Sequence, residues 1–222
     1  MRLQGACWNR LPCNENDGLT RYGMNDVRFI GIHGMGGVGK TTLSQVIYDR
    51  FSHQFEGSSF IASVRESSGN QGLLLLQKQL LCQILKEREL DVWSVSQGTK
   101  MIASRLRYRT VFVVLDDVNT QEQLEALVGS RDWFGPGSRI IFTSRDSHLL
   151  YSHGGKDMYL YELKGLNSEE ALELFSLSAF KKPCPEEDYW DLSKYFVNYT
   201  QGLPLALKVL GLFCLVEQKI NG

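Results

Sequence analysis

The feature that most constrains this chain is a glycine-rich segment that ends in a lysine and two threonines. It runs from Gly34 to Thr42 and reads Gly-Met-Gly-Gly-Val-Gly-Lys-Thr-Thr, which fits the phosphate-binding loop pattern of Gly, four residues, Gly-Lys-Ser/Thr. Residues 27–32 before it form an apolar run typical of a buried parallel strand. The apolar residues of 42–51 after it recur at helical spacing. The loop therefore lies where a strand passes into a helix.

Each residue type in this loop has a physical reason to be there. Glycines let the backbone fold closely round a phosphate, with N–H groups pointing inward at the positive end of the following helix. Lys40 would reach the β- and γ-phosphates of a nucleotide, and the Thr41 hydroxyl would hold Mg²⁺. The alternative, a glycine-rich turn that binds nothing, is disfavoured by the strand-to-helix context. The expected nucleotide-binding residues of this segment are Gly34, Met35, Gly36, Gly37, Val38, Gly39, Lys40, Thr41 and Thr42.

Charge and cysteine usage disfavour several classes of function. The 24 Lys and Arg residues against 25 Asp and Glu residues leave no basic excess for nucleic acid or an anionic membrane. The five cysteines are scattered without Cys-x-x-Cys spacing, which is typical of reduced intracellular thiols and disfavours a structural zinc site. The apolar run 203–216 is too short to span a bilayer, and residues 1–10 lack the core of a secretory signal. We therefore expect a cytoplasmic protein with no nucleic-acid or membrane partner.

Strands and helices alternate along the chain up to about residue 165. After the glycine-rich loop, buried strands are predicted at 58–65, 111–115, 139–145 and 158–163. Amphipathic helices are predicted at 73–85, 98–108 and 121–128, and the leucine stripe of the first indicates core packing rather than a partner-binding zipper. This alternation predicts an α/β domain over residues 25–165, with a parallel sheet flanked by helices.

The apolar strand 111–115 ends in two carboxylates, Asp116 and Asp117. Ligands of open α/β sheets bind outside the carboxyl ends of the strands, so these side chains should lie beside the phosphate-binding loop. One would hold Mg²⁺ and the other would orient or deprotonate a water molecule. The alternative is that the acidic pair only caps the next helix. Its position some 75 residues after Thr41 favours the role at the phosphates.

The strand 139–145 ends in Arg145. An arginine at the carboxyl edge of the sheet is well placed to sense a γ-phosphate or to stabilise charge on it. A surface ion pair, for instance with Asp146, explains the residue equally well from spacing alone. Both interpretations stay open at this point.

The pattern becomes purely helical after about residue 165. Asn167 followed by Glu170 predicts a helix start, a second helix is predicted at 189–199, and Pro204 opens a third where a missing N–H does no harm. Leu192, Phe196 and Tyr199 are expected on the inner face of the second helix. We interpret 166–222 as an incomplete small helical domain, and residues 1–24 as a leader or linker without an assigned role.

Five motifs in this order and spacing make the chain similar to a known family. It resembles the nucleotide-binding (NB-ARC) domain of plant disease-resistance proteins, a family shared with animal apoptotic protease-activating factors. Asn119 and the segments 55–66 and 163–167 resemble the class that begins with a Toll/interleukin-receptor-type domain. The resemblance covers about residues 25–211 and rests on the segments 34–42, 55–66, 115–118, 137–146 and 202–207.

The resemblance implies a P-loop NTPase fold and a role for each matched residue. Lys40 and the loop amides would bind the phosphates of ADP or ATP. Thr41 and Asp116 would hold Mg²⁺, and Asp117 would position the attacking water as the catalytic residue. Arg145 matches the family's γ-phosphate sensor, and Pro204 matches a proline that packs near the adenine. The segment 6–23 shows no match to the family's adenine-binding motif.

The function that the resemblance implies is an ADP/ATP switch of an intracellular plant immune receptor, with slow hydrolysis at most. In the family, exchange of ADP for ATP permits opening and homo-oligomerisation, and the partners are other domains of the same receptor. The family's second helical subdomain and leucine-rich repeats find no match here, so we expect a fragment. The competing functions are a turnover ATPase of the P-loop class and a truncated decoy or interaction protein.

Overall fold

The protein is described by a computed structural model that covers residues 25–67, 69–155 and 158–221. These residues divide into two units. The first unit contains residues 25–34 and Lys40–Glu162, and the second contains Met35–Gly39 together with residues 163–221. Within the second unit, the Leu205 N–H donates a hydrogen bond of 3.2 Å to the Gly37 carbonyl oxygen, which ties the loop segment to the helices.

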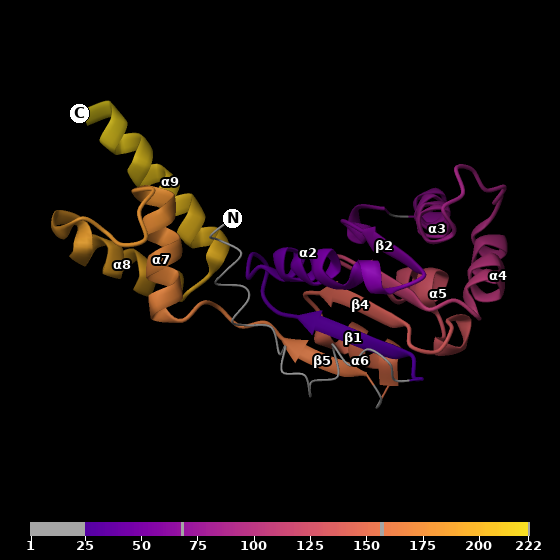
Figure 1. Cartoon of the computed structure of the whole chain (residues 1–222). Helices are drawn as coiled ribbons and strands as arrows, with labels where there is room; N and C mark the ends of the chain where they lie inside the picture. The colour runs from indigo at the N-terminus through magenta and orange to yellow at the C-terminus, as the bar shows by residue number, and fades with distance from the viewer. Residues whose placement is uncertain (1–24, 68, 156–157, 222) are drawn as a thin grey trace. The chain divides into compact units, whose positions relative to one another are not determined.

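The first unit is built on a parallel sheet, which has five strands in the described residues (Figure 1). The strand order is β2-β3-β4-β1-β5, and each pair of neighbours is parallel. β4 therefore lies between β1, which leads into the glycine-rich loop, and β3, which leads into the acidic pair. The strand bounds are β1 Arg28–His33, β2 Gly57–Ile61, β3 Val111–Leu115, β4 Arg139–Ser144 and β5 Tyr159–Glu162.

Helices connect these strands, as parallel pairing requires. The α-helices of this unit are α2 (Lys40–Phe51), α3 (Gly69–Leu85), α4 (Val95–Leu106), α5 (Gln121–Val128) and α6 (Ser147–Gly154). Among the elements described in full, the 3₁₀ turns η1 (Ser52–Gln54), η2 (Val64–Glu66) and η3 (Arg131–Trp133) also lie in these connections. The start of α5 is fixed by a capping box. The Thr120 side chain accepts a hydrogen bond from the Gln123 N–H, and the Gln123 side chain accepts one from the Thr120 N–H.

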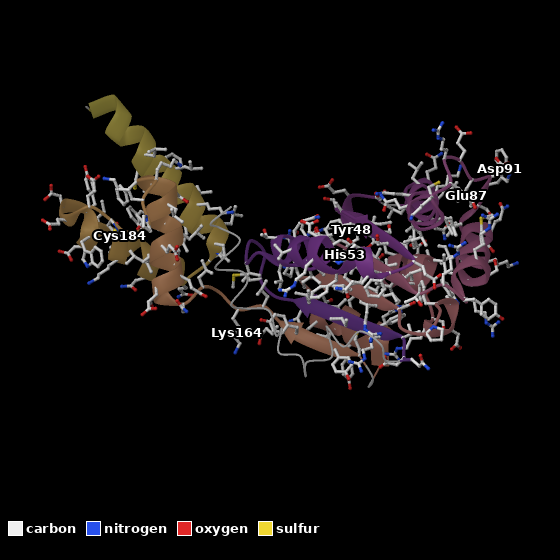
Figure 2. The ribbon with its side chains drawn as sticks, in the orientation of Figure 1. Tyr48, His53, Glu87, Asp91, Lys164 and Cys184 are labelled. Carbon is white, nitrogen blue, oxygen red and sulfur yellow. The ribbon has the colours of Figure 1, made fainter. Side chains whose placement is uncertain are left out.

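Helices cover both faces of the sheet. Tyr48 of α2, labelled in Figure 2, stacks on Phe112 of β3 with ring centroids 5.9 Å apart. His153 of α6 stacks on Phe29 of β1 at 5.7 Å. Phe112 is paired with Arg139 of β4, and Phe29 is paired with the next residue along β4. Because consecutive strand residues point to opposite faces, α2 and α6 lie on opposite sides of the sheet.

The leucine stripe of α3 is part of the core, as predicted. Leu76, Leu80, Leu81 and Ile84 pack with residues of β2, β3, α4 and α5 in one apolar cluster. Deep burial removes water from both the helix stripe and the sheet face, which stabilises the fold by roughly 25 cal/mol per Å² of apolar surface. The buried residues of this stripe are Leu73, Leu76, Leu80, Leu81 and Ile84.

One prediction about this unit was wrong in detail, and one helix was missed. β2 ends at Ile61 rather than continuing to Arg65, because Ser63 adopts a left-handed backbone with φ of 51° and starts the η2 turn. The helix α6 was not predicted at all. Asp146 begins it by accepting hydrogen bonds from the N–H groups of His148 and Leu149, a capping role that its position after a strand obscured.

The second unit contains three α-helices in its described part, α7 (Ser168–Ala179), α8 (Trp190–Thr200) and α9 (Pro204–Asn221), with the 3₁₀ turn η5 (Glu187–Tyr189) before α8. The predicted start of α7 is confirmed by a capping box between Asn167 and Glu170. Pro204 is the first residue of α9, where proline fits best. No helix among the described residues is long and apolar enough to cross a membrane.

The predicted inner face of α8 was wrong. Leu192 and Tyr199 are exposed, the latter by 74%, whereas the buried residues of the helix are Ser193, Val197 and Thr200. The structure rotates the helix so that its smaller side chains meet α7 and α9. Small side chains allow the helices to pack closely. The aromatic ring of Phe196 packs against that of Phe175, with ring centroids 5.6 Å apart.

Candidate functional site

The candidate site begins in the loop between β1 and α2. Gly37 and Gly39 have φ values of 79° and 101°, in a region that side chains with a Cβ rarely adopt. α2 begins at Lys40, directly after the last glycine. Its first N–H groups have no partner within the helix and mark the positive end of the helix dipole. The sequence of the loop thus produces the backbone bend and helix start that an anion requires.

Lys40 is largely buried in the structure. Its side chain is 7% exposed, and its Nζ donates a hydrogen bond of 2.8 Å to the Gly34 carbonyl oxygen. Burial lowers the pKa of the Lys40 ammonium below its ordinary value, and the nearby charge of Arg145 acts in the same direction. The carboxylates of Asp117 and Asp116 oppose this shift. These four charged residues therefore share one local electric field.

Thr41 and Asp116 lie in direct contact. The Thr41 hydroxyl donates to the Asp116 carboxylate, with oxygen–oxygen distances of 3.0 and 2.9 Å to Oδ1 and Oδ2. Magnesium binds oxygen ligands octahedrally at about 2.0–2.1 Å, so two neighbouring ligands are about 2.9 Å apart. The hydroxyl and the carboxylate therefore fit adjacent positions around Mg²⁺. The sequence predicted both residues, and the structure brings them together.

Thr143 fixes the acidic pair and was not assigned a role from the sequence. Its hydroxyl donates to Asp116 Oδ1 at 2.6 Å and accepts from the Asp117 N–H at 2.8 Å. Its carbonyl oxygen accepts from the Val118 N–H at 2.9 Å. The available signal was a threonine that follows the apolar run 140–142 near the end of the strand. Such a residue at the carboxyl edge of a parallel sheet can reach the end of the neighbouring strand.

Asp117 is held in an uncommon backbone conformation, with φ of 57°. Its carboxylate faces two arginines, with Arg145 Nε at 3.7 Å from Oδ1 and Arg65 Nη1 at 4.0 Å from Oδ2. Asp146, the other partner considered for Arg145, instead caps α6. Arg145 is therefore directed toward the acidic pair, and Arg65 is a second arginine that the sequence did not assign to the site.

The positions of Pro204 and Thr42 in the structure do not indicate a contact with nucleotide. Pro204 starts α9 in the second unit, which accounts for the residue as a helix-starting proline, and its contact with an adenine stays a prediction. Thr42 lies on the exposed side of α2.

The arrangement in the first unit can hold a nucleoside polyphosphate. Lys40 supplies a buried positive charge beside the loop, and Thr41 with Asp116 supplies oxygen ligands for Mg²⁺. Asp117 offers a carboxylate for orienting a water molecule, and Arg145 offers a positive charge at the end of β4. Positioning and charge stabilisation of this kind are what phosphoryl transfer and phosphate sensing need.

Comparisons with known proteins agree with this geometry. Residues 16–184 match the family model described as the NB-ARC domain. The chain is 51% identical over 196 residues to disease resistance protein RUN1 of Vitis rotundifolia, a match that covers 88% of this chain. It is 43% identical over 202 residues, again 88% of this chain, to TMV resistance protein N of Nicotiana glutinosa. The chain spans only 14% and 17% of the lengths of these two relatives.

Solved structures with low sequence identity share the fold. Cdc6p from Pyrobaculum aerophilum superposes with a TM-score of 0.66 at 14% identity, and the match covers 99% of this chain and 62% of that one. The ORC2 protein of Aeropyrum pernix, solved as ADPNP and ADP complexes, gives a TM-score of 0.56 at 14% identity, over 99% of this chain and 63% of that one. At such identities the likeness shows the architecture alone.

Proposed function

The chain belongs to the NB-ARC domain family, and from this premise we propose that it is the ADP/ATP switch module of a cytoplasmic plant immune receptor. Its relatives carry the names of resistance proteins, and the chain corresponds to a small part of their length. The switch role, its resting nucleotide and its Mg²⁺ are all part of this proposal. So are its partners, which would be other domains of the receptor and further copies after activation.

One observation carries the proposal. The Thr41 hydroxyl and the Asp116 carboxylate come from segments 75 residues apart, yet their oxygens lie 2.9–3.0 Å apart. This spacing matches the edge of a magnesium octahedron. Both residues are next to Lys40, whose ammonium is buried. A bound Mg²⁺-nucleotide would give Lys40, Thr41 and Asp116 charged ligand contacts in addition to the hydrogen bonds that they already make within the protein.

A γ-phosphate would distinguish the two nucleotide states through charge. It would add interactions with Lys40, with the Mg²⁺ held by Thr41 and Asp116, and with Arg145. ADP has no γ-phosphate and cannot make these additional interactions. A ligand shifts a conformational equilibrium only by its difference in affinity for the two states. The extra charged contacts supply such a difference, and this is how nucleotide switches operate.

The test is a pair of measurements on purified protein. First, any copurifying nucleotide is released by denaturation and identified by chromatography, with ADP or ATP expected. Second, binding of ADP and ATP with Mg²⁺ is measured by calorimetry for the wild type and for Lys40→Ala. The loss of a charged hydrogen bond costs about 1.5–3 kcal/mol, so binding should weaken by roughly tenfold or more.

Lys100→Ala is the matched control, because Lys100 is exposed on α4 and distant in sequence from the loop. It should bind nucleotide like the wild type. Circular dichroism of both variants separates lost binding from lost fold. Unchanged nucleotide affinity in a folded Lys40→Ala protein would contradict the assignment of the phosphate-binding loop.

A further inference from the structure

Arg65 is built into the candidate site through its backbone. The turn η2 that carries it is fixed to the end of β3, because the Val64 N–H donates to the Asp116 carbonyl oxygen at 2.9 Å. The Arg65 N–H donates to the Asp117 carbonyl oxygen at 3.1 Å. On the other side of the turn, Gln123 Nε2 donates to the Val64 carbonyl oxygen at 3.2 Å. Arg65 thus has a fixed starting point directly beside the acidic pair.

The two arginines face different oxygens of one carboxylate. Arg145 Nε is 3.7 Å from Asp117 Oδ1, and Arg65 Nη1 is 4.0 Å from Oδ2. Both distances exceed those of hydrogen bonds, which end near 3.2 Å for N–H···O. The attraction is therefore Coulombic and does not commit either guanidinium to one geometry. Both arginine side chains are also about half exposed, so a change of partner needs little rearrangement.

The charges make the second arginine consequential. Arg65, Arg145 and Asp117 together carry one net positive charge, which attracts a γ-phosphate. Without Arg65 the remaining pair is neutral, and the Asp117 carboxylate has Arg145 as its one positive partner within ion-pair distance among the contacts of the described residues. The carboxylate then competes with the phosphate for Arg145 and also repels the phosphate directly.

We propose that Arg65 is a specificity-determining residue that neutralises Asp117, and thereby leaves Arg145 available for the γ-phosphate of ATP. This inference rests on the proposed nucleotide-binding function and extends it to the choice between ATP and ADP. Arg65 acts through Asp117 and Arg145, so it is a positioning residue rather than a phosphate ligand. ADP lacks the group concerned, and its affinity is independent of Arg65.

The experiment measures ATP and ADP affinities by calorimetry, with Mg²⁺ present, for wild type, Arg65→Ala, Arg65→Lys and the double variant Arg65→Ala/Asp117→Asn. A partly exposed ion pair is worth up to about 1 kcal/mol, so ATP should bind Arg65→Ala about fivefold more weakly. ADP affinity should stay within about twofold. Arg65→Lys keeps the charge and should bind ATP like the wild type, and raised salt should shrink the difference.

The double variant separates the proposed role from a structural one. Replacing Asp117 by asparagine removes the unpaired carboxylate, so ATP affinity should return to that of the wild type. The control is Arg105→Ala. Arg105 lies on α4 and forms an ion pair with Glu87. The Arg105 side chain is 43% exposed, which matches the 44% exposure of the Arg65 side chain. This control should change neither affinity. If Arg65→Ala is poorly folded, Arg65→Gln keeps most of the side-chain stem and carries the same expectation.

Each remaining result overturns the inference. Unchanged ATP affinity in the variant without Arg65, or equal losses for both nucleotides, means that Arg65 does not select ATP. Failure of Asp117→Asn to restore ATP binding means that Arg65 does not act through Asp117. A folded wild type that binds neither nucleotide overturns the proposed function and this inference together. If the wild type binds both nucleotides and any of the first three results is found, the inference about Arg65 is wrong and the proposed nucleotide-binding function still stands.

Discussion

Replacing Thr143 by valine tests whether the acidic pair is held by a single hydroxyl. Valine has nearly the same shape and suits a buried strand, so the substitution removes hydrogen bonds without leaving a large cavity. Two bonds are lost, the one donated to Asp116 at 2.6 Å and the one accepted from the Asp117 N–H at 2.8 Å. The first bond is buried and the second is partly buried, and Thr143 itself is only 1% exposed.

The magnitude follows from what each lost bond leaves behind. A hydrogen bond to a charged group contributes about 1.5–3 kcal/mol, and a buried N–H without a partner costs about 1–3 kcal/mol. Thr41 still donates to Asp116, which offsets part of the first loss. We expect a decrease of about 3 kcal/mol in the free energy of unfolding. For a chain of this size that corresponds to a Tm lower by roughly 6–12 °C.

The assay is hydrogen exchange of the β3 and β4 amides without nucleotide, which reports the stability of the unit that contains Thr143, together with thermal unfolding followed by circular dichroism. The matched control is Thr143→Ser, which keeps the hydroxyl and loses only a methyl group, at a cost of about 1 kcal/mol. A valine variant as stable as the serine variant would refute the argument that the hydroxyl holds the acidic pair.

Three further predictions follow from the site and its surroundings. Arg145→Ala should weaken ATP binding by roughly tenfold or more and ADP binding little, because only ATP carries the γ-phosphate; equal losses in a calorimetric titration would reduce Arg145 to a structural residue. Steady-state phosphate release should stay below about one ATP per minute, against a median enzyme rate of about 10 per second, and Asp117→Ala should lower it further while ATP stays bound. Lys40→Ala is the blank for that assay, and turnover of several per second would favour the ATPase. Burial lowers the pKa of His153, so the unfolded chain takes up its proton at higher pH than the folded one. The free energy of unfolding should therefore fall as pH decreases from about 7 through the ordinary histidine pKa of about 6.5 to the lower folded pKa, with a slope of at most about 1.4 kcal/mol per pH unit; His153→Asn should flatten this slope in denaturant titrations, and His148→Asn on the exposed side of α6 should not.

Local patterns in the sequence predicted the parts of the fold that depend on neighbouring residues. The glycine-rich loop, the strand 111–115 and the helix 121–128 were placed at their observed positions. In each of these segments the apolar residues recur regularly, and a boundary signal such as a glycine run or a cap lies within a few residues of the element. The expected proximity of Thr41 and Asp116 needed one additional rule, that ligands bind at the carboxyl ends of parallel strands.

The features that the sequence did not reveal depend on contacts between distant segments. Thr143 acts on the acidic pair only because β3 and β4 are neighbours with Leu115 opposite Phe142, and no local pattern encodes that register. Arg65 was predicted at the end of a strand, and its proximity to Asp117 follows from the left-handed Ser63 that turns the chain toward the end of β3. The burial of Lys40 likewise results from the folded surroundings and not from its position in the loop.

The strand order explains why the end of β4 matters for function. β4 lies between β1 and β3, so its last residues are adjacent both to the phosphate-binding side and to the acidic pair. Thr143 holds Asp116 and the backbone of Asp117, and Arg145, two residues later, faces the Asp117 side chain. A phosphate that draws Arg145 toward itself would therefore act on the same strand end that orients Asp116, the proposed Mg²⁺ ligand, and Asp117, the proposed water-positioning carboxylate. In the proposed switch, γ-phosphate sensing and hydrolysis are coupled through this one short segment, and substitutions at Thr143 should affect both.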